Sequence, residues 1–245
     1  MINIKNLKKD YHTKEGEINA IKDISININK NDIISIIGPS GCGKSTILSI
    51  LAELDKDYKG NIIKNSNTQV GYMMQNDALL PFLTIYDNII LGLKIQNKLN
   101  SESIEYINNL INLYNLEEFK DKYPNSLSGG MRQRCSLIRT LALKPNVLLL
   151  DEPFSSLDEK TRMIISNDIY NYARCNNITI VLITHSINEA IYFSNRVIIL
   201  SQRPSIIKKE INIDIPMDIS INERRSHNKF NEYYDILYKE LDNNE

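Results

Sequence analysis

A nine-residue segment, Gly38–Thr46, constrains the fold of this chain more than any other part of the sequence. It reads Gly-Pro-Ser-Gly-Cys-Gly-Lys-Ser-Thr and fits the spacing Gly-x-x-x-x-Gly-Lys-Ser. An apolar run at Ile33–Ile37 precedes it, and a helix-compatible segment at Ile47–Leu54 follows it. This order predicts a buried strand, a glycine-rich turn and a helix whose N-terminal N–H groups favour phosphate oxygens, which a turn that binds nothing would not require. Lys44 is then expected to reach the β- and γ-phosphates of a nucleotide, and Ser45 to ligate Mg²⁺.

Apolar runs typical of strands alternate with helix-compatible segments over much of the chain. The expected strands are Ile24–Ile28, Ile33–Ile37, Ile62–Ile63, Val70–Met74, Val147–Leu150, Ile178–Ile183, Val197–Leu200 and, with looser alternation, 206–215. Residues 84–145 are mostly helical in pattern, and a terminal helix carries an apolar stripe of Phe230, Tyr234, Leu237 and Leu241. Such alternation predicts an α/β fold with a mainly parallel sheet, and the helical stretch predicts an inserted subdomain.

Composition excludes several classes of protein. The 245 residues carry a net charge of −1 with a pI near 6.3, so no basic field predicts nucleic-acid binding. No apolar run approaches the roughly 20 residues of a membrane span, and the first ten residues lack the apolar core of a signal peptide. Cys42, Cys135 and Cys175 show no paired spacing, which predicts reduced thiols, with Cys42 filling space in the loop rather than reacting. These features predict a cytosolic chain that reaches a membrane only through a partner.

Two adjacent carboxylates, Asp151 and Glu152, follow the apolar run Val147–Leu150. The carboxyl end of a buried strand is where open α/β sheets build ligand sites. Asp151 is expected to hold Mg²⁺ directly or through water, and Glu152 to polarise an attacking water as general base. A solvated acidic turn would explain the pair alone, but the phosphate-binding loop elsewhere in the chain favours the site.

A second glycine pair occurs in Ser128-Gly129-Gly130, just before an expected helix at Cys135–Leu143. A hydroxyl and two N–H groups without side chains at a helix start form another anion-binding cradle. One nucleotide needs one cradle, so the second is expected to reach the γ-phosphate held by another copy of the chain. A flexible Ser-Gly-Gly linker fits poorly beside the helical segment that follows.

In these motifs the sequence resembles the nucleotide-binding subunit of ATP-binding-cassette (ABC) transporters, and the resemblance covers nearly the whole chain. After the phosphate loop come Gln75, similar to the family's Q-loop glutamine, then Leu127-Ser128-Gly129-Gly130-Met131 as the signature, the strand 147–152, Ser155–Asp158 as the D-loop, and His185 as the switch histidine. The resemblance implies nucleotide contacts from Tyr11, which would stack on adenine, and from Gly38, Pro39, Ser40, Gly41, Cys42, Gly43, Lys44, Ser45, Thr46, Ser128, Gly129 and Gly130. It implies catalytic roles for Lys44, Gln75, Glu152 and His185, and metal ligation by Ser45, Gln75 and Asp151.

The family resemblance implies a P-loop NTPase cassette with a mainly parallel core sheet, an N-terminal antiparallel β portion and an inserted helical subdomain. Residues 1–75 and 146–215 would form the nucleotide-binding core, 76–145 the helical signature subdomain, and 216–245 a C-terminal helical tail. Two copies would sandwich two ATP molecules with Mg²⁺. The implied partners are a second copy, transmembrane permease subunits and, indirectly, a solute-binding protein, with the chain peripheral on the cytoplasmic face of the membrane.

The signature departs from the family pattern at one position, where Met131 replaces the common Gln. A thioether cannot donate a hydrogen bond, so we expect tuned turnover rather than lost activity. The form Leu-Ser-Gly-Gly-Met-Arg-Gln-Arg, with Ser201-Gln202-Arg203-Pro204 and the late Pro216, looks like the subgroup that serves nitrate, sulfonate, taurine and pyrimidine-precursor importers.

Other functions are weighed against transport. A cassette ATPase of DNA repair would carry long heptad insertions, and the sequence has no such periodicity. An ATP-dependent signalling or cell-division module stays open as an alternative, because a fold and a site do not fix the biological use. A simple phosphoryl-transferring kinase is disfavoured by the second glycine cradle.

Overall fold

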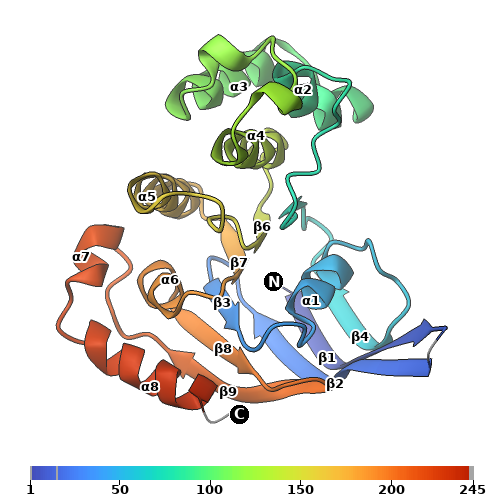
Figure 1. Cartoon of the computed structure of the whole chain (residues 1–245), viewed down its shortest axis with the longest axis vertical. Coiled ribbons are helices and arrows are strands. Elements are labelled where there is room, and N and C mark those ends of the chain that lie inside the picture. Colours follow the sequence, from blue (N-terminus) through green and yellow to red (C-terminus); the bar gives the residue numbers. More distant parts are fainter. Residues whose placement is uncertain (1, 15, 243–245) are drawn as a thin grey trace.

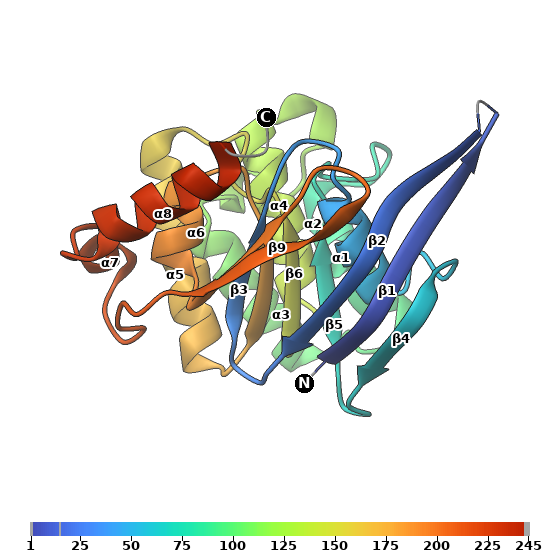
Figure 2. The ribbon, with the colours of Figure 1, turned by 90° about the horizontal axis from the view of Figure 1, so that it is seen from below.

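A nine-stranded sheet organises the computed structural model, which describes residues 2–14 and 16–242. Its strand order is β4-β1-β2-β9-β8-β3-β7-β6-β5. The strands are β1 (Ile2–Thr13), β2 (Gly16–Ile28), β3 (Ile33–Ile37), β4 (Lys59–Lys64), β5 (Val70–Met73), β6 (Val147–Asp151), β7 (Thr179–Ile183), β8 (Arg196–Leu200) and β9 (Ser205–Asn212). Neighbours from β8 through β3, β7 and β6 to β5 pair in parallel, whereas β1 pairs antiparallel with both β2 and β4. Figure 2 shows the long β1–β2 pair beside β9 and β4. The predicted fold class is confirmed.

The helices lie in separate groups around this sheet (Figure 1). They are α1 (Lys44–Leu51), α2 (Ile85–Ile95), α3 (Ser101–Leu113), α4 (Gly129–Leu141), α5 (Glu159–Cys175), α6 (Ile187–Phe193), α7 (Ile221–Arg225) and α8 (Phe230–Asp242), with short 3₁₀ turns at Glu117–Phe119 and Pro124–Ser126. Helices α2, α3 and α4 stand together at the top of Figure 1, away from α7 and α8. No helix in the described ranges has both the length and the apolar character needed to cross a bilayer.

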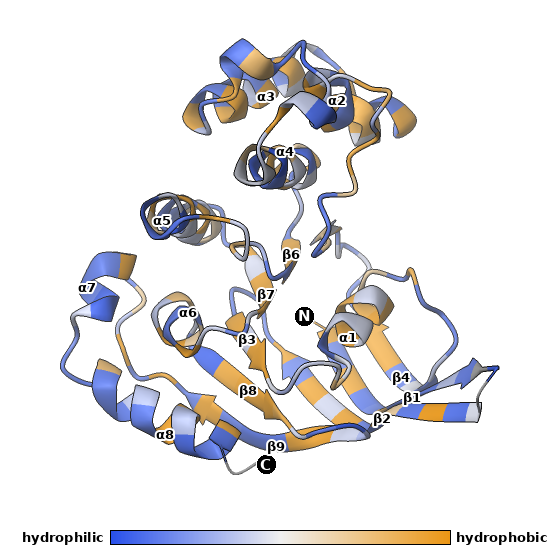
Figure 3. Cartoon of the chain, viewed as in Figure 1, coloured by the Kyte–Doolittle hydropathy of each residue, from blue (hydrophilic) through white to orange (hydrophobic). Residues whose placement is uncertain are grey.

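Burial on both faces explains the apolar character of the central strands. All five residues of β3, β6 and β7 are buried, and their alternate side chains enter two different apolar clusters. Leu148 and Leu150 face the cluster formed with α2–α6, while Val147 and Leu149 face the cluster formed with α1, β1 and β2. Figure 3 shows orange, hydrophobic stretches along the central strands, including β3 and β8. Parallel strands covered on both sides require such continuous apolar runs.

The helical group is fixed by side-chain caps and one buried amide. Thr84 caps α2 by accepting from the Asp87 N–H at 3.0 Å, and Asn100 with Ser103 forms a reciprocal capping box on α3. Asn88 is fully buried, and its amide bonds backbone groups of Leu80, Leu83 and Thr84. This amide holds the segment that leads from β5 into α2 in one conformation, since all its polar atoms are satisfied within the fold.

Two helix boundaries differ from the sequence-based expectation. Helix α1 covers Lys44–Leu51 rather than 47–54, because left-handed Gly43 (φ 99°) starts it within the phosphate loop and Glu53 (φ 62°) interrupts it. Helix α4 begins at Gly129 rather than Cys135, since the Ser128 side chain caps it by accepting from the Met131 N–H at 3.3 Å. The cap outweighs the poor helix propensity of the two glycines.

The predicted terminal helix, with its stripe from Phe230 to Leu241, is α8, and the shorter helix α7 precedes it in the tail; residues 243–245 lie outside the described residues. Phe230 and Leu237 of α8 are buried, as the apolar stripe predicts. Arg224 of α7 is also completely buried, although it is charged. Its guanidinium donates to five backbone carbonyls, those of Ile191, Tyr192, Ser194, Ile215 and Pro216. The tail is thereby bonded to the C-terminal end of α6.

Candidate functional site

A cavity of about 310 Å³ opens beside the phosphate loop. Strands β1, β2, β3, β5, β6, β7 and β8 deliver the loops or side chains that surround it, and the phosphate loop follows β3. Its lining residues are Tyr11, Ala20, Ser40, Gly41, Gly43, Lys44, Ser45, Thr46, Gln75, Glu152, His185 and Arg203. The cavity therefore brings together most of the candidate site residues, from segments that are up to 174 positions apart from Tyr11 to His185.

The phosphate loop curls around the Lys44 side chain. Lys44 is 5% exposed, and its Nζ donates to the carbonyls of Gly38 at 2.9 Å and Pro39 at 2.8 Å. A side chain at Gly38 would approach the Leu200 carbonyl oxygen to 2.9 Å, so this position is restricted to glycine. Cys42 does not line the cavity but is buried in the apolar cluster beneath it, and burial raises the pKa of its thiol. This placement agrees with a space-filling cysteine.

Tyr11 marks the other end of the cavity. Its hydroxyl lies 3.1 Å from the Thr46 Oγ1, and the Lys9 Nζ lies 4.7 Å from its ring centroid. Lys9 is 4% exposed and forms ion pairs with Asp55 at 3.0 Å and Asp57 at 3.4 Å. Burial alone would lower the pKa of Lys9, but the two carboxylates outweigh it and raise the pKa. A cation against the ring on one side fixes the tyrosine as a platform for a ligand on its other side.

Glu152 lies between two side chains from other strands. Its Oε1 is 2.6 Å from the His185 Nε2, and its Oε2 accepts from the Gln75 Nε2 at 3.2 Å. The residue adopts φ 50°, a left-handed conformation uncommon outside glycine, while its N–H donates to the Ile183 carbonyl at 3.0 Å. This turn at the end of β6 directs the carboxylate into the cavity between the Q-loop and switch residues.

Asp151 differs from its neighbour because it is 2% exposed. The Tyr72 hydroxyl donates to its Oδ2 at 3.4 Å, and Ser45 interacts with the same carboxylate. Its Oδ1 is buried with no hydrogen-bond partner among the described residues. Burial raises the pKa of Asp151, and the hydrogen bond from Ser45 opposes this effect. An uncompensated buried carboxylate oxygen beside a serine hydroxyl is the arrangement that a hard divalent cation satisfies.

The signature segment lies apart from this cavity. Ser128, Gly129 and Gly130 are not among its lining residues in the described chain, and Gly129 instead borders a smaller cavity with Gln75, Asp77 and Ser156. Helix α4 nevertheless contacts the end of β6 through Gln133. This amide donates to the Glu152 carbonyl at 3.2 Å and accepts from the Ser156 hydroxyl at 2.5 Å. The Met131 side chain packs against the larger apolar cluster. It therefore makes apolar contacts at a position where a Gln would offer hydrogen-bonding groups.

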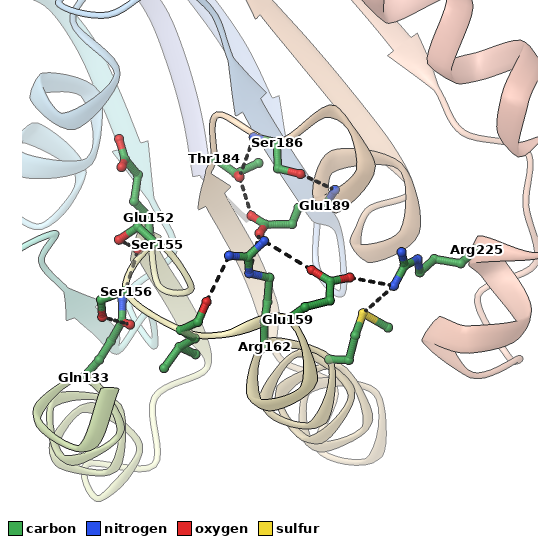
Figure 4. Close-up of polar contacts among 12 residues, drawn as sticks. Gln133, Glu152, Ser155, Ser156, Glu159, Arg162, Thr184, Ser186, Glu189 and Arg225 are labelled. Atoms are coloured by element: carbon green, nitrogen blue, oxygen red, sulfur yellow. Dashed lines mark hydrogen bonds and ion pairs between the residues drawn. The ribbon is translucent and has the colours of Figure 1, made fainter. Parts of the chain in front are cut away.

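A polar network connects the D-loop with the switch turn, as Figure 4 shows. Arg162 of α5 donates to the Leu157 carbonyl at 3.0 Å, and its Nε lies 3.7 Å from the Glu189 carboxylate. Glu189 is buried and accepts from Thr184 Oγ1, which also accepts from the Ser186 N–H at 3.0 Å. The network therefore holds the two residues that flank His185. The Ser186 side chain caps α6 by accepting from the Glu189 N–H at 3.3 Å, while the Glu189 carboxylate bonds Thr184.

Sequence reasoning missed Lys9, Gln133, Arg162, Glu189 and Arg203 as members of the site. Their signals are weak because each stands alone in the sequence, and four of the five act through backbone groups or through partners distant along the chain. Gln133 and Arg203 belonged to segments that the sequence singled out, but no role for either residue followed from those segments.

Replacing Arg162 with Met should lower both stability and turnover. Loss of the guanidinium removes the hydrogen bond to the Leu157 carbonyl and leaves the buried Glu189 carboxylate without its countercharge, which costs about 1–3 kcal/mol of unfolding free energy. ATP affinity should change little since Arg162 does not line the cavity of the phosphate loop. Denaturant unfolding and steady-state ATPase assays measure these effects. Arg174→Met, an exposed arginine on the same helix, is the control, and adding Glu189→Gln should restore part of the stability; an additive loss would contradict the pairing.

The geometry defines a class of protein before any comparison. A phosphate loop opening a helix, a magnesium-type aspartate and an adjacent glutamate at a parallel strand's end are the parts of a P-loop nucleotide-hydrolysing enzyme. The family model of ABC transporters matches residues 21–155, more than half of the chain. The chain belongs to this family and is an ATP-hydrolysing cassette.

Relatives match over nearly the whole length. The aliphatic sulfonates import ATP-binding protein SsuB of Bacillus cereus is 37% identical over 228 residues, which are 90% of this chain and 89% of that protein. The nitrate import ATP-binding protein NrtD of a Synechocystis species is 33% identical over 235 residues, 92% of this chain and 87% of its own. The dimeric structure of MJ0796, a bacterial ABC transporter cassette, superposes with a TM-score of 0.79 at 31% identity, covering 88% of this chain and 100% of that one.

Proposed function

We propose that this chain hydrolyses ATP to drive solute import through membrane permease subunits. The observation that carries the proposal is the single cavity in which Lys44, Gln75, Glu152 and His185 converge. The relatives whose names specify import of sulfonates and nitrate support the transport role and its direction. They also favour transport over a signalling or cell-division role.

Within the cavity, each residue has a role that its position permits. Lys44 and the loop N–H groups hold the β- and γ-phosphates, and Tyr11 supports the adenine. Glu152 takes a proton from the attacking water, and His185, 2.6 Å from that carboxylate, contacts the γ-phosphate and fixes the base. Gln75 donates a hydrogen bond to the same carboxylate, so a movement of the Q-loop would shift the position of the base. In the attack the water oxygen bonds to phosphorus as the bond to ADP breaks.

The residues present fit Mg²⁺. Asp151, with its unpartnered Oδ1, and Ser45 would hold the ion, with Gln75 as a further ligand. The ion would neutralise charge on the phosphates when bound.

A second copy of the chain would complete each site. The first-turn N–H groups of Gly129 and Gly130 have no acceptor within α4, and they lie outside the cavity of their own chain. We infer that they bind the γ-phosphate held by the partner, in two sandwiched sites. The dimeric state of the similar MJ0796 cassette, also solved with ADP and Pi, supports this arrangement. In this proposal residues 1–75 and 146–215 bind the nucleotide, 76–145 supply the signature and 216–245 form the tail.

The permease would dock beside the Q-loop, which places the chain peripherally on the cytoplasmic face of the membrane. Phe82 is 71% exposed and Met74 is also exposed, both on the segment from β5 to α2 that Asn88 fixes. An exposed apolar pair at the hinge of the helical subdomain suits a membrane subunit that must sense closure. A solute-binding protein would act on the permease and not on this chain.

Phe82→Asp tests the proposed coupling. Expressed with permease subunits that co-purify with the native chain, the variant should lose co-purification with the membrane subunits and at least about 90% of transport, as expected for an interface anchor. Its ATPase activity without permease should equal that of the wild type. Ile95→Asp, an equally exposed position at the end of α2, is the control. Wild-type transport by Phe82→Asp, or the absence of any permease that co-purifies with the native chain, would contradict the proposal.

A further inference from the structure

The turn between β8 and β9 brings an arginine to the nucleotide cavity that the mechanism above does not use. Arg203 lies in this turn, Ser201–Pro204, and lines the same cavity as Lys44 and Thr46. An exposed arginine on a turn is ordinarily a solvated surface residue. Three features of the turn distinguish it from that case.

The residues on either side of the turn lie against the two ends of the phosphate loop. The Leu200 carbonyl, just before the turn, is the group that a side chain at Gly38 would approach to 2.9 Å. Ser205, just after it, lies 3.6 Å from the Cβ position of Gly43 through its Oγ. The two ends of the turn therefore lie close to Gly38 and Gly43, and the turn lies against the phosphate loop.

The turn is also rigid within itself and against β2. Ser205 is fully buried, and its hydroxyl donates to the Ala20 carbonyl at 3.1 Å. Across the turn, the Ser201 N–H donates to the Ile206 carbonyl at 3.0 Å, and the Ile206 N–H donates to the Ser201 Oγ at 3.1 Å. The Cα of Arg203 is therefore held at the cavity without needing a contact from its own side chain.

The guanidinium has no partner that would neutralise it. Within residues 2–14 and 16–242, Arg203 makes no hydrogen bond or ion pair, whereas most arginines of this chain bond a carbonyl or a carboxylate. Of the other basic side chains of the cavity, Lys44 already donates to two carbonyls and His185 lies 2.6 Å from the Glu152 carboxylate. An unpaired arginine held at a cavity that binds a polyanion is available for that anion.

We propose that Arg203 is a nucleotide-binding residue whose guanidinium contacts the phosphate chain of ATP. A planar fork of N–H donors matches phosphate oxygens in two-point contacts. The Tyr11 ring already offers an aromatic platform at the adenine end, so the charge of Arg203 serves the anionic part of the ligand. The β8–β9 turn is thus a third element of the phosphate site, beside the loop and the signature of the partner.

The test compares Arg203→Met, Arg203→Gln and Arg203→Lys with the wild type in binding ATP, ADP and adenosine. Titration calorimetry is suitable, because the chain has no tryptophan to report binding. The Met and Gln variants should bind ATP and ADP about tenfold more weakly, as for one lost charge-assisted contact, with adenosine within twofold. Arg203→Lys should bind ATP more tightly than Arg203→Met. The KM for ATP should rise with kcat unchanged, since the contact is made in ground and transition states alike.

The controls separate a lost contact from a damaged fold. Arg174→Met removes an exposed arginine far along α5 and should leave all three affinities unchanged. Thermal unfolding should show equal Tm values for wild type and variants. An unchanged ATP affinity in both Arg203→Met and Arg203→Gln would overturn the proposal, as would an equal loss for adenosine, which would place the guanidinium on the purine. Raising the salt concentration should narrow the difference in ATP affinity between wild type and Arg203→Met. A difference in affinity that does not change with salt would also count against a phosphate contact.

Discussion

Lys44→Ala is expected to abolish ATPase activity. Lys44 supplies the positive charge at the centre of the phosphate loop, and its Nζ also bonds the carbonyls that set the loop's curvature. Without it, charge developing on the transferred phosphoryl group loses its nearest protein cation, and removal of one such donor costs about 100- to 1,000-fold in turnover. Phosphate release by the purified variant at saturating ATP measures the loss.

Lys59→Ala is the matched control, because Lys59 is a solvated lysine on β4 whose weak ion pair with Asp10 spans 3.8 Å. It should retain wild-type turnover and thermal stability. Normal turnover by Lys44→Ala would refute the assignment of the phosphate site, whatever the effect of the control.

Glu152→Gln should bind ATP and hydrolyse it slowly, so that the ATP-bound form accumulates as a dimer. The amide preserves the shape of the side chain but cannot accept a proton, and loss of a general base costs about 100- to 10,000-fold in rate. Nucleotide sandwiched between two copies then stays intact and keeps them together. Size exclusion chromatography in ATP and Mg²⁺ should show the variant at twice the monomer mass, while the wild type returns to monomer.

Glu102→Gln, a change in an exposed surface carboxylate of α3, should behave as the wild type in the same experiment. If Glu152→Gln elutes only as monomer in ATP, the inference of a shared site fails even if its hydrolysis is slow. If it hydrolyses ATP normally, another group is the base and the dimer inference is untouched. The two outcomes therefore test two different statements about the site.

The parts of the fold predicted from sequence are those with strong local signals. Apolar runs predicted β3, β6 and β7, because strands buried on both faces carry few polar residues to interrupt the pattern. The start of α4 was not predicted, because a single serine cap overrides two glycines that argue against helix. Strand β1 was not delimited either. Its register shifts against β2 break the alternation on which a sequence reading depends.

The order of the motifs along the chain predicted which residues belong to the site, but not how their side chains are arranged. The motifs indicated that Gln75, Glu152 and His185 belong to one site. The structure adds that the Gln75 and His185 side chains both contact the Glu152 carboxylate. The supporting contacts of Gln133 and Arg162 could not be predicted, since each reaches a backbone carbonyl that carries no sequence signal. Polar residues on an amphipathic helix predict a solvated face, and only the tertiary fold shows which of them bond a partner.

The buried Arg224 limits where this chain can be shortened. Its guanidinium is the donor for five carbonyl oxygens, three of which lie at or just beyond the end of α6. The opposite end of α6 follows His185 directly. A chain terminated ahead of Arg224 would leave these oxygens without a donor in a buried interior and loosen α6, whose N-cap residue Ser186 follows His185 directly. A C-terminal truncation that preserves the segment around His185 must therefore retain Arg224, and the tail is a structural component of the ATPase.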